Sequence, residues 1–326
     1  MALITGVTGQ DGSYLADFLL SKDYKVIGLQ RRTVGSNEDK QRNILHLLHN
    51  QDFIIESGDV TDSSSLWRVI NQHSPTEVYN LAAQSHVGES FKSPISTTEI
   101  NAIGTLNILE AIRNINPDIR FYQASTSEMF GDNIVCPQSE GTRFSPVSPY
   151  AVSKMMAHNM VSVYRKSYEM HASSGILFNH ESPRRGENFV TRKITKAAAR
   201  IKLGLQDQLL LGNLEAQRDW GFAGDYVKAM WMMLQQESAD DYVIATGTTH
   251  SVQQFLEFVF EHAGLNVAEH VGIDPRFYRP CEVPRLWGDP TKAQTALGWK
   301  PEVSFRDLAV MMYESDLESE KRRVND

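Results

Sequence analysis

Short apolar runs alternate with amphipathic segments through the first half of the chain. The runs have the length of buried strands, and the segments between them have the 3.6-residue period of helices. The predicted strands are residues 1–5, 25–29, 53–57, 77–81, 120–124 and 175–178. Because each apolar run is followed by a helical or loop segment before the next, the pattern predicts an α/β fold with a doubly wound parallel sheet.

Beyond residue 178 the alternation loosens. Further helices are predicted at residues 190–203, 226–234, 252–262 and 305–323, and further strands at 209–211 and 242–245. We therefore expect a nucleotide-binding Rossmann domain made of residues 1–178 plus about 219–246. A smaller, discontinuous substrate-binding lobe would take residues 179–218 and 247–326.

Composition narrows the class of protein. The 326 residues carry a formal charge of −8, which argues against a general nucleic-acid or anionic-membrane surface. The two cysteines, Cys136 and Cys281, have neither metal-ligand spacing nor the density of a disulfide scaffold, and no metal is expected. The longest apolar run, residues 229–234, is too short to span a bilayer, and Gly6 interrupts the apolar start too early for a signal peptide. These features favour a cytoplasmic protein.

Three glycines follow the first strand at a spacing of three: Gly6, Gly9 and Gly12, with Gln10 and Asp11 between them. Glycine permits positive φ angles and close approach of the backbone, so the next helix can present its N-terminal amides to a diphosphate. An ordinary βα turn is the alternative. The position at the head of an alternating strand and helix pattern favours nucleotide binding.

Polar residues after the next strands suggest which nucleotide binds. Arg31 and Arg32 follow the second strand, where an arginine can pair with a 2′-phosphate, so the sequence favours NADP over NAD. Two solvated arginines are the alternative. Asp59 follows the third strand and could accept from an adenine amine or cap a helix, whereas Asp62 is better explained as a helix cap.

The fourth strand leads into Ala82, Ala83, Gln84, Ser85 and His86. The small residues would let a cofactor lie against the backbone. For His86, a structural hydrogen bond is preferred to a catalytic role.

The segment from 124 to 154 carries the candidate chemistry. Ser148 can cap a helix that begins at Pro149, and this places Tyr150 and Lys154 on one helical face. An ammonium beside a phenol is expected to lower the phenol pKa and make it a usable base. Such a pair is expected about once by chance in a chain of this composition, so the surrounding motifs must show whether it is catalytic.

Taken together, the glycine turn, the double arginine, the Ser-Thr-Ser-Glu stretch at 125–128 and the Tyr150 and Lys154 pair resemble the extended short-chain dehydrogenase/reductase superfamily. Within it, the chain is similar to the GDP-mannose 4,6-dehydratase family over nearly its whole length, with a specific string at residues 178–185. The resemblance implies conversion of GDP-D-mannose to GDP-4-dehydro-6-deoxy-D-mannose, with NADP as a bound cofactor that is not consumed.

The resemblance also implies residue roles. Tyr150 would take the C4 hydroxyl proton, Lys154 would support it, Glu128 would remove the C5 hydrogen, and Thr126 would bond the oxygen at C4 and contact the substrate. The implied cofactor positions are Gly6, Gly9, Gln10, Asp11, Gly12, Arg31, Arg32, Asp59, Val60, Leu81, Ala82, Ala83, Gln84, Ser85, Tyr150, Lys154, His180 and Arg185. The implied substrate positions are Ser85, Thr126, Asn179, Asn188, Lys193, Arg218, Arg279 and Glu282. For single members of the substrate group, a structural salt bridge is the alternative.

The resemblance further implies a homodimer or homotetramer. The segment at 33–42 differs from the serine-rich loop that reaches a neighbouring cofactor site in tetrameric relatives. A nucleotide-sugar 4-reductase or 4-epimerase is the rival enzyme, and it would need Tyr150 and Lys154 but not Glu128. A non-catalytic NADP-binding protein is the rival from another class, and it would have no reason to carry all four catalytic residues.

Overall fold

The computed structural model describes residues 1–31, 41–278 and 281–325. Arg32, most of the 33–42 segment and Arg279 therefore lie outside the described residues. Within the described part of the chain, seven strands form one parallel sheet in the order β3-β2-β1-β4-β5-β6-β11. These strands are β1 (Ala2–Thr5), β2 (Val26–Gln30), β3 (Phe53–Ser57), β4 (Glu77–Asn80), β5 (Arg120–Thr126), β6 (Ala172–Leu177) and β11 (Asp241–Ile244). The strand order reverses between β1 and β4, which is where a doubly wound sheet binds its ligand.

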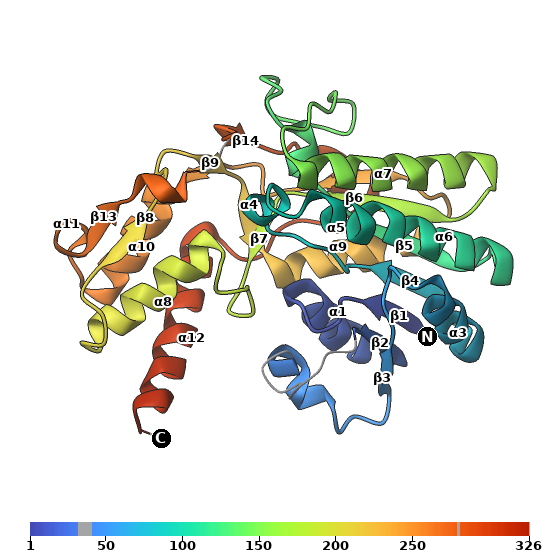
Figure 1. Cartoon of the computed structure of the whole chain (residues 1–326), viewed down its shortest axis with the longest axis horizontal. Coiled ribbons are helices and arrows are strands. Elements are labelled where there is room, and N and C mark those ends of the chain that lie inside the picture. Colours follow the sequence, from blue (N-terminus) through green and yellow to red (C-terminus); the bar gives the residue numbers. More distant parts are fainter. Residues whose placement is uncertain (32–40, 279–280, 326) are drawn as a thin grey trace.

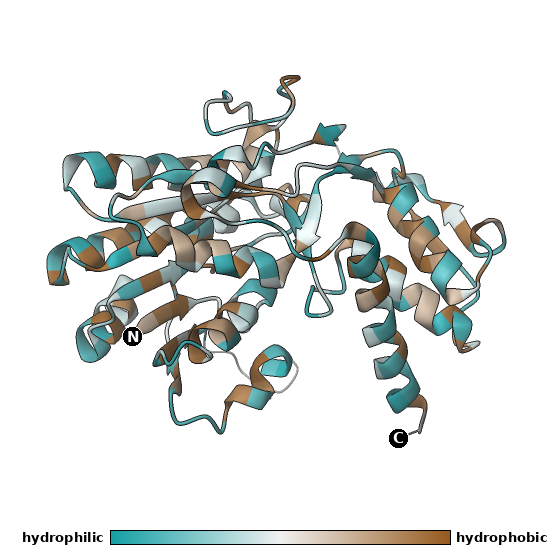
Figure 2. Ribbon diagram, turned by 180° about the vertical axis from the view of Figure 1, so that it is seen from behind, coloured by the Kyte–Doolittle hydropathy of each residue, from teal (hydrophilic) through white to brown (hydrophobic). Residues whose placement is uncertain are grey.

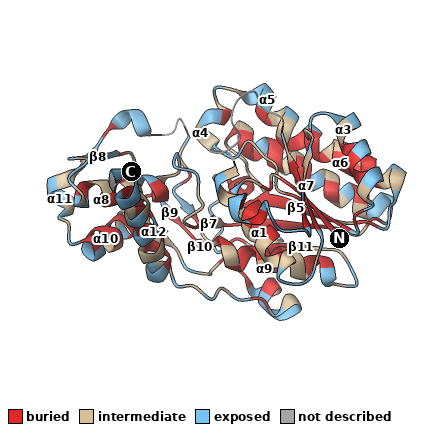
Figure 3. Ribbon diagram, turned by 90° about the horizontal axis from the view of Figure 1, so that it is seen from below, coloured by how far each residue is buried: buried red, intermediate tan, exposed pale blue. Residues whose placement is uncertain are grey.

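Helices cover both faces of the sheet (Figure 1). One face is covered by α1 (Gln10–Leu20) and α9 (Ala223–Gln235), and the other by α3 (Ser63–His73), α6 (Gly104–Ile115) and α7 (Pro149–Ser167). Alternate residues of β1 enter different cores: Ala2 and Ile4 pack on the α1 side, and Leu3 packs on the α3 side. Figure 3 shows the strands buried between helices whose outer faces are exposed. The predicted fold class is confirmed.

Local signals placed two helix starts correctly. Ser148 caps α7, and its Oγ accepts a hydrogen bond of 3.1 Å from the backbone nitrogen of Ala151. Asp62 caps α3 in the same way, with 3.0 Å to the nitrogen of Ser64. The amphipathic segment from Pro94 to Ile115 is helical throughout but not uniform, because a π-helical turn, η2 (Glu99–Ile103), separates α5 (Pro94–Thr98) from α6. A π turn depends on local packing, so the apolar period does not reveal it.

A second lobe packs around a core of its own. It is built on α8 (Val190–Lys202), α10 (Val252–Ala263) and α12 (Phe305–Asn325), whose apolar residues include Ile194, Phe255 and Met312. Figure 2 shows apolar and polar residues alternating along these helices. The pairs β13 (Val271–Ile273) with β8 (Leu209–Leu211), and β12 (His250–Ser251) with β9 (Gln217–Arg218) and β14 (Arg285–Leu286), complete the lobe.

A short parallel pair, β7 (Asn179–Glu181) with β10 (Trp220–Phe222), follows the sheet strand β6 and leads toward the lobe. The remaining short helices are η1 (Arg42–Leu47), α4 (Val87–Ser90), η3 (Ser127–Phe130), α11 (Val267–His270), η4 (Pro275–Phe277) and η5 (Ala293–Leu297). Among the described residues, no helix is long and apolar enough to cross a membrane.

Candidate active site

The glycine turn between β1 and α1 packs tightly against the end of β4. Gly6 has φ = +69°, and a Cβ on it would lie 2.9 Å from the nitrogen of Ala82. A Cβ on Gly12 would lie only 2.3 Å from the carbonyl oxygen of Gly6. Both positions therefore require glycine. The turn brings the N-terminal amides of α1 to the carboxyl edge of the sheet, between β1 and β4, where a nucleotide diphosphate would fit.

Side chains of this turn hold the segment that follows β6. The Gln10 side chain donates to the carbonyl of His180 at 3.0 Å and accepts from the Ser182 hydroxyl at 2.8 Å. The Asp11 carboxylate lies 2.8 Å from Nε2 of His180, whose Nδ1 lies 2.7 Å from the carbonyl of Phe178. The first turn of α1 and the 178–182 segment are thus one hydrogen-bonded unit.

The half-buried Asp11 pairs with the buried His180. Burial alone would raise the pKa of Asp11, but the charge and hydrogen bond of His180 outweigh it and bring that pKa to about 2. Burial alone would lower the pKa of His180, but Asp11 reverses the direction and raises it. The ring of His180 also stacks on Tyr226, with centroids 4.6 Å apart. His180 is therefore fixed beside the glycine turn, and Asp11 favours its charged form.

The segment after β4 is fixed by two side chains that the sequence analysis did not single out. Oγ1 of Thr5 accepts from the backbone nitrogens of Leu81 and Ala82, both at 3.1 Å. The Asn101 side chain bonds both backbone groups of Gln84, at 2.9 and 3.1 Å. Thr5 is the polar last residue of the buried strand β1, and Asn101 lies between the apolar residues Ile100 and Ala102, so a polar residue among apolar neighbours is the signal that could have found them.

Asn101 also connects this segment to α7. Its Nδ2 lies 3.0 Å from Oγ of Ser153, which in turn donates to the carbonyl of Tyr150 at 2.7 Å. Oε1 of Gln84 is buried and has no hydrogen-bond partner among the described residues, so it is available to a ligand. Ala83 and Ser85 lie at the same edge, half-buried and exposed respectively. His86 caps α4 by accepting from the nitrogen of Glu89 at 3.0 Å, which confirms a structural hydrogen bond.

The four predicted catalytic residues lie at the carboxyl end of β5 and on the facing turn of α7. Thr126 ends β5, Glu128 is in η3, and Tyr150 and Lys154 are on α7. The Thr126 Oγ1 accepts from the nitrogen of Glu128 at 3.3 Å. The Thr126 hydroxyl and the Glu128 carboxylate both shift the pKa of Tyr150, so these three side chains share one site. Their exposed fractions are 8, 9 and 8%, and that of Lys154 is 3%.

The expected lowering of the Tyr150 pKa is wrong for this structure. Burial raises the pKa of Tyr150 to about 12, although the hydrogen bond of Thr126 and the charge of Arg185 act to lower it. Lys154 instead donates from Nζ to the carbonyl of Ala124 at 2.9 Å, and burial lowers its own pKa to about 8. Spacing of four along a helix places the two residues on one face, but the depth of burial decides which charge is stable.

Arg185, another predicted cofactor residue, acts electrostatically on this site. Its charge acts on the pKa values of Tyr150, Asp11 and His180. Its Nε lies 3.1 Å from Oε2 of Glu181, and its guanidinium covers the ring of Phe189 at 3.5 Å. The loop after β7 therefore brings a cation to the site that contains Tyr150.

The residues predicted to contact the adenosine end of the cofactor lie at the ends of β2 and β3. Arg31 is exposed directly after β2. Oδ1 of Asp59 accepts from the backbone nitrogen of Thr61 at 2.9 Å and from its hydroxyl at 2.8 Å, so Asp59 closes a local turn. Val60 is buried beside it and belongs to the core on the α3 side.

The predicted substrate residues are only partly brought together. Arg218, which is 5% exposed, lies with Nη2 3.2 Å from Oε1 of Glu282. Asn179 is in β7, paired with Trp220 of β10. Asn188 and Lys193 are exposed at the start of α8, and Nζ of Lys193 lies 5.1 Å from the ring centre of Phe277. These residues lie in the second lobe or at its junction with the sheet.

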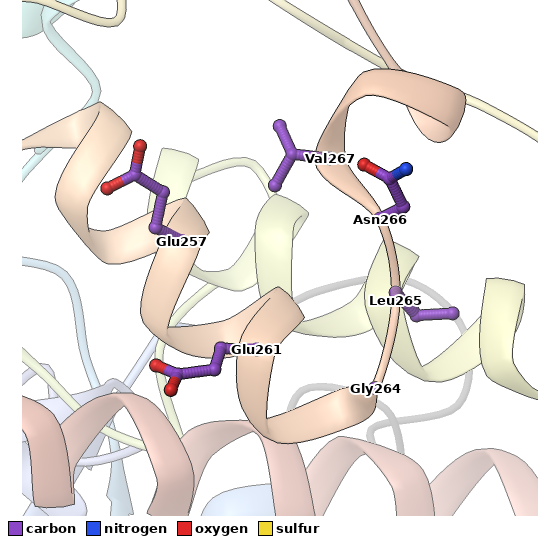
Figure 4. Close-up of a pocket in the computed structure, with 6 residues that line it drawn as sticks. All are labelled: Glu257, Glu261, Gly264, Leu265, Asn266 and Val267. Atoms are coloured by element: carbon purple, nitrogen blue, oxygen red, sulfur yellow. The ribbon is translucent and has the colours of Figure 1, made fainter.

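A hollow elsewhere in the second lobe is unrelated to this site. It is formed by the end of α10 and the segment that leads to α11 (Figure 4), and its lining residues are Glu257, Glu261, Gly264, Leu265, Asn266 and Val267. None of them belongs to the predicted cofactor, substrate or catalytic groups.

Comparisons with known proteins agree on the family. A family model described as GDP-mannose 4,6 dehydratase matches residues 3–312. GDP-mannose 4,6 dehydratase 1 of Arabidopsis thaliana is 55% identical over 99% of this chain and 91% of its own, and GDP-mannose 4,6-dehydratase of Sinorhizobium fredii (strain HH103) is 52% identical over 97% and 96%. Among solved structures, UDP-glucose 4-epimerase of Thermus thermophilus in complex with NAD is 26% identical, with a TM-score of 0.82 over 97% of this chain and 98% of its own.

Proposed function

The chain belongs to the GDP-mannose 4,6-dehydratase family and is a hydro-lyase that acts on GDP-mannose, and we propose that it works through bound NADP and the side chains of Thr126, Glu128, Tyr150 and Lys154. The product is GDP-4-dehydro-6-deoxy-D-mannose. The observation that carries the proposed roles is the placement of a carboxylate, Glu128, beside the phenol of Tyr150.

Glu128 is the residue that distinguishes dehydration from simple redox chemistry. Once C4 of the hexose is a ketone, the hydrogen at C5 is acidic enough for a carboxylate to remove. Glu128 then holds that proton and can donate it to the hydroxyl at C6, which leaves as water. A 4-epimerase or 4-reductase would have no use for a base at this position.

Tyr150 is the acid and base for the oxygen at C4. With a pKa of about 12 the phenol is protonated near neutral pH, so ionisation during turnover depends on the groups around it. The Thr126 hydroxyl and the Arg185 charge both favour the phenolate. Thr126 can also donate to the C4 oxygen as its charge changes, and this matters most in the transition state. Lys154 contributes a buried cation at the same turn of α7.

The residues present fit a dinucleotide. The glycine turn lets the start of α1 pack directly against the end of β4, so the helix amides can meet a diphosphate, and Oε1 of Gln84 is a buried acceptor with no partner among the described residues. When bound, NADP supplies a hydride acceptor and later a hydride donor. Arg31 would pair with a 2′-phosphate, and this supports NADP rather than NAD. Gln10, Asp11 and His180 hold the surrounding segments in place.

The second lobe would bind the nucleotide sugar. In a protein of formal charge −8, a diphosphate must be met by individually placed cations, and Arg218 and Lys193 are the described candidates. Glu282, held to Arg218, would accept hydrogen bonds from the ribose or the base. Asn179 and Asn188 would add neutral donors. This assignment extends to Arg279, which lies outside the described residues.

We further propose the domain division expected from the sequence, together with a cytoplasmic homodimer or homotetramer. The separate cores of the sheet and of the second lobe support two units, while Ala293 and Trp299 of the expected lobe pack in the core of the sheet. Exposed apolar side chains on α5 and α7, namely Ile95, Val152 and Val163, support self-association. Light scattering of the protein eluted from a size-exclusion column would measure the number of subunits. A monomer at all concentrations would contradict the proposed self-association.

The decisive experiment is incubation of the purified protein with GDP-mannose in the absence of added reductant, followed by mass spectrometry. We expect a nucleotide sugar that has lost one water. An unchanged mass under conditions where GDP-mannose binds would contradict the assignment and favour a 4-epimerase. The Glu128→Gln variant is the matched control, since it keeps the shape of the side chain and removes the base.

A further inference from the structure

Arg192 lies where three segments of the chain meet. Its side chain is 3% exposed, and Nε and Nη2 donate to the two carboxylate oxygens of Asp316 on α12 at 3.1 and 2.7 Å. Nη1 donates to the carbonyl of Pro183 and, at 2.8 Å, to that of Arg185. A guanidinium presents its N–H groups in a fixed plane, so one side chain can hold a helix on one edge and a loop on the other.

The loop that Arg192 holds is the one that carries Arg185. Glu181, at the start of this loop, accepts from the Thr191 hydroxyl at 2.5 Å and pairs with Nε of Arg185 at 3.1 Å. The first turn of α8 therefore contacts the loop twice, through Thr191 and through Arg192. Because the Arg185 charge acts on Tyr150, a shift of the loop would change the environment of the catalytic phenol.

We propose that Arg192, oriented by Asp316, is a positioning residue that sets the 183–185 loop and thereby places Arg185 in the active site. The inference rests on the proposed function, and it extends the site to the final helix, α12. The carboxylate of Asp316 fixes the plane of the guanidinium, and that plane aims Nη1 at the two loop carbonyls. α8 and α12 lie side by side in Figure 1.

The alternative is that the Arg192–Asp316 pair only joins α8 to α12. A second ion pair between the same two helices provides a control for this alternative. Arg200 donates from Nη1 to Oε2 of Glu320 at 3.0 Å, about two turns further along α8. Glu320 is as buried as Asp316, at 3 and 4% exposed. The other nitrogens of Arg200 face Gln206 and the carbonyl of Leu205, away from the loop.

The test compares Arg192→Lys, Asp316→Asn and Glu320→Gln by steady-state kinetics with GDP-mannose and by thermal unfolding. We expect Arg192→Lys to lower kcat/KM by at least about tenfold, because small displacements of a site group are costly. Asp316→Asn should also lower kcat/KM, whereas Glu320→Gln should keep a kcat/KM near that of wild type. The melting temperatures of these two carboxylate variants should fall by similar amounts. Equal activity in the two carboxylate variants would overturn the inference. If Arg192→Lys does not fold, the comparison of Asp316→Asn with Glu320→Gln still tests the inference.

A double-mutant cycle shows whether Arg192 acts through Arg185. In an Arg185→Gln background, Arg192→Lys should cause little further loss of kcat/KM, whereas independent effects would multiply and contradict the inference. A wild-type protein that forms no dehydrated product would instead refute the proposed function. The two failures are therefore distinguishable.

Discussion

Replacement of Lys154 by methionine should abolish turnover without lowering the stability of the fold. Burial moves the lysine pKa from 10.5 to about 8, so at neutral pH the fold keeps an ammonium charged at a cost of about 3 kcal/mol. Methionine removes that cost and fills a similar volume. It also leaves the Ala124 carbonyl without its donor, which costs about 1–3 kcal/mol. The variant should therefore be as stable as wild type or slightly more stable at pH 7.

The pH dependence has a definite sign. A lysine with a lowered pKa in the folded state binds fewer protons folded than unfolded between about pH 8 and 10.5. Stability therefore rises with pH in that window and is flat below it. Between pH 7 and 9, wild type should gain about 1 kcal/mol relative to Lys154→Met.

Urea unfolding of both proteins without nucleotide, at pH 7 and at pH 9, measures this difference. Lys166→Met removes an exposed charge from the same helix and controls for the change in net charge. A stability difference between wild type and Lys154→Met that is independent of pH, or that falls as pH rises, would refute the reasoning. Full turnover in Lys154→Met would remove this residue from the mechanism.

Four further predictions follow from the site. Tyr150→Phe should lower the rate of dehydration by roughly 10²- to 10⁴-fold, the usual contribution of a positioned acid or base, and near wild-type turnover would exclude the role. Glu128→Gln should allow oxidation at C4 but not loss of water, so the absorbance of reduced nicotinamide should rise on adding GDP-mannose while mass spectrometry detects no 6-deoxy product. Gly12→Ala should lower the free energy of unfolding in urea by about 1–3 kcal/mol, because the new methyl group would lie 2.3 Å from the Gly6 carbonyl oxygen. It should also weaken nucleotide binding measured by calorimetry. Gly141→Ala is the control, because a methyl group there would have nothing within 4 Å. Asp11→Asn should lower the pKa of His180 measured by NMR titration, and an unchanged pKa would show that Asp11 is not its cause.

The parts of the fold that were predictable depend on short stretches of sequence. Apolar runs placed the central strands of the sheet, and Ser148 and Asp62 marked helix starts because a cap is a contact within three residues. The glycine spacing predicted the turn for the same reason. The π turn at η2 and the three-residue strands β7 and β10 have no such local pattern, since packing between distant segments determines them.

The site was predictable as a set of residues but not as an electrostatic environment. Tyr150 and Lys154 could be placed on one helical face, yet the pKa of Tyr150 depends on burial by segments far along the chain. Arg192 belongs to a helix rich in basic residues, 190–203, and such a pattern usually indicates a solvated face, whereas Arg192 is buried against Asp316, 124 residues away. Contacts of this kind arise only when segments far apart in the sequence pack against each other.

The position of Asp316 on α12 also orders events during synthesis. The seven strands of the sheet are complete once residue 244 has been made, but Arg192 gains its carboxylate partner only with residue 316. Since chains begin to fold from their N-terminal side as they are made, the sheet can form while the Arg185 loop still lacks its support. A nascent chain is thus expected to have a folded scaffold before it has a competent site, and activity should be the last property that synthesis confers.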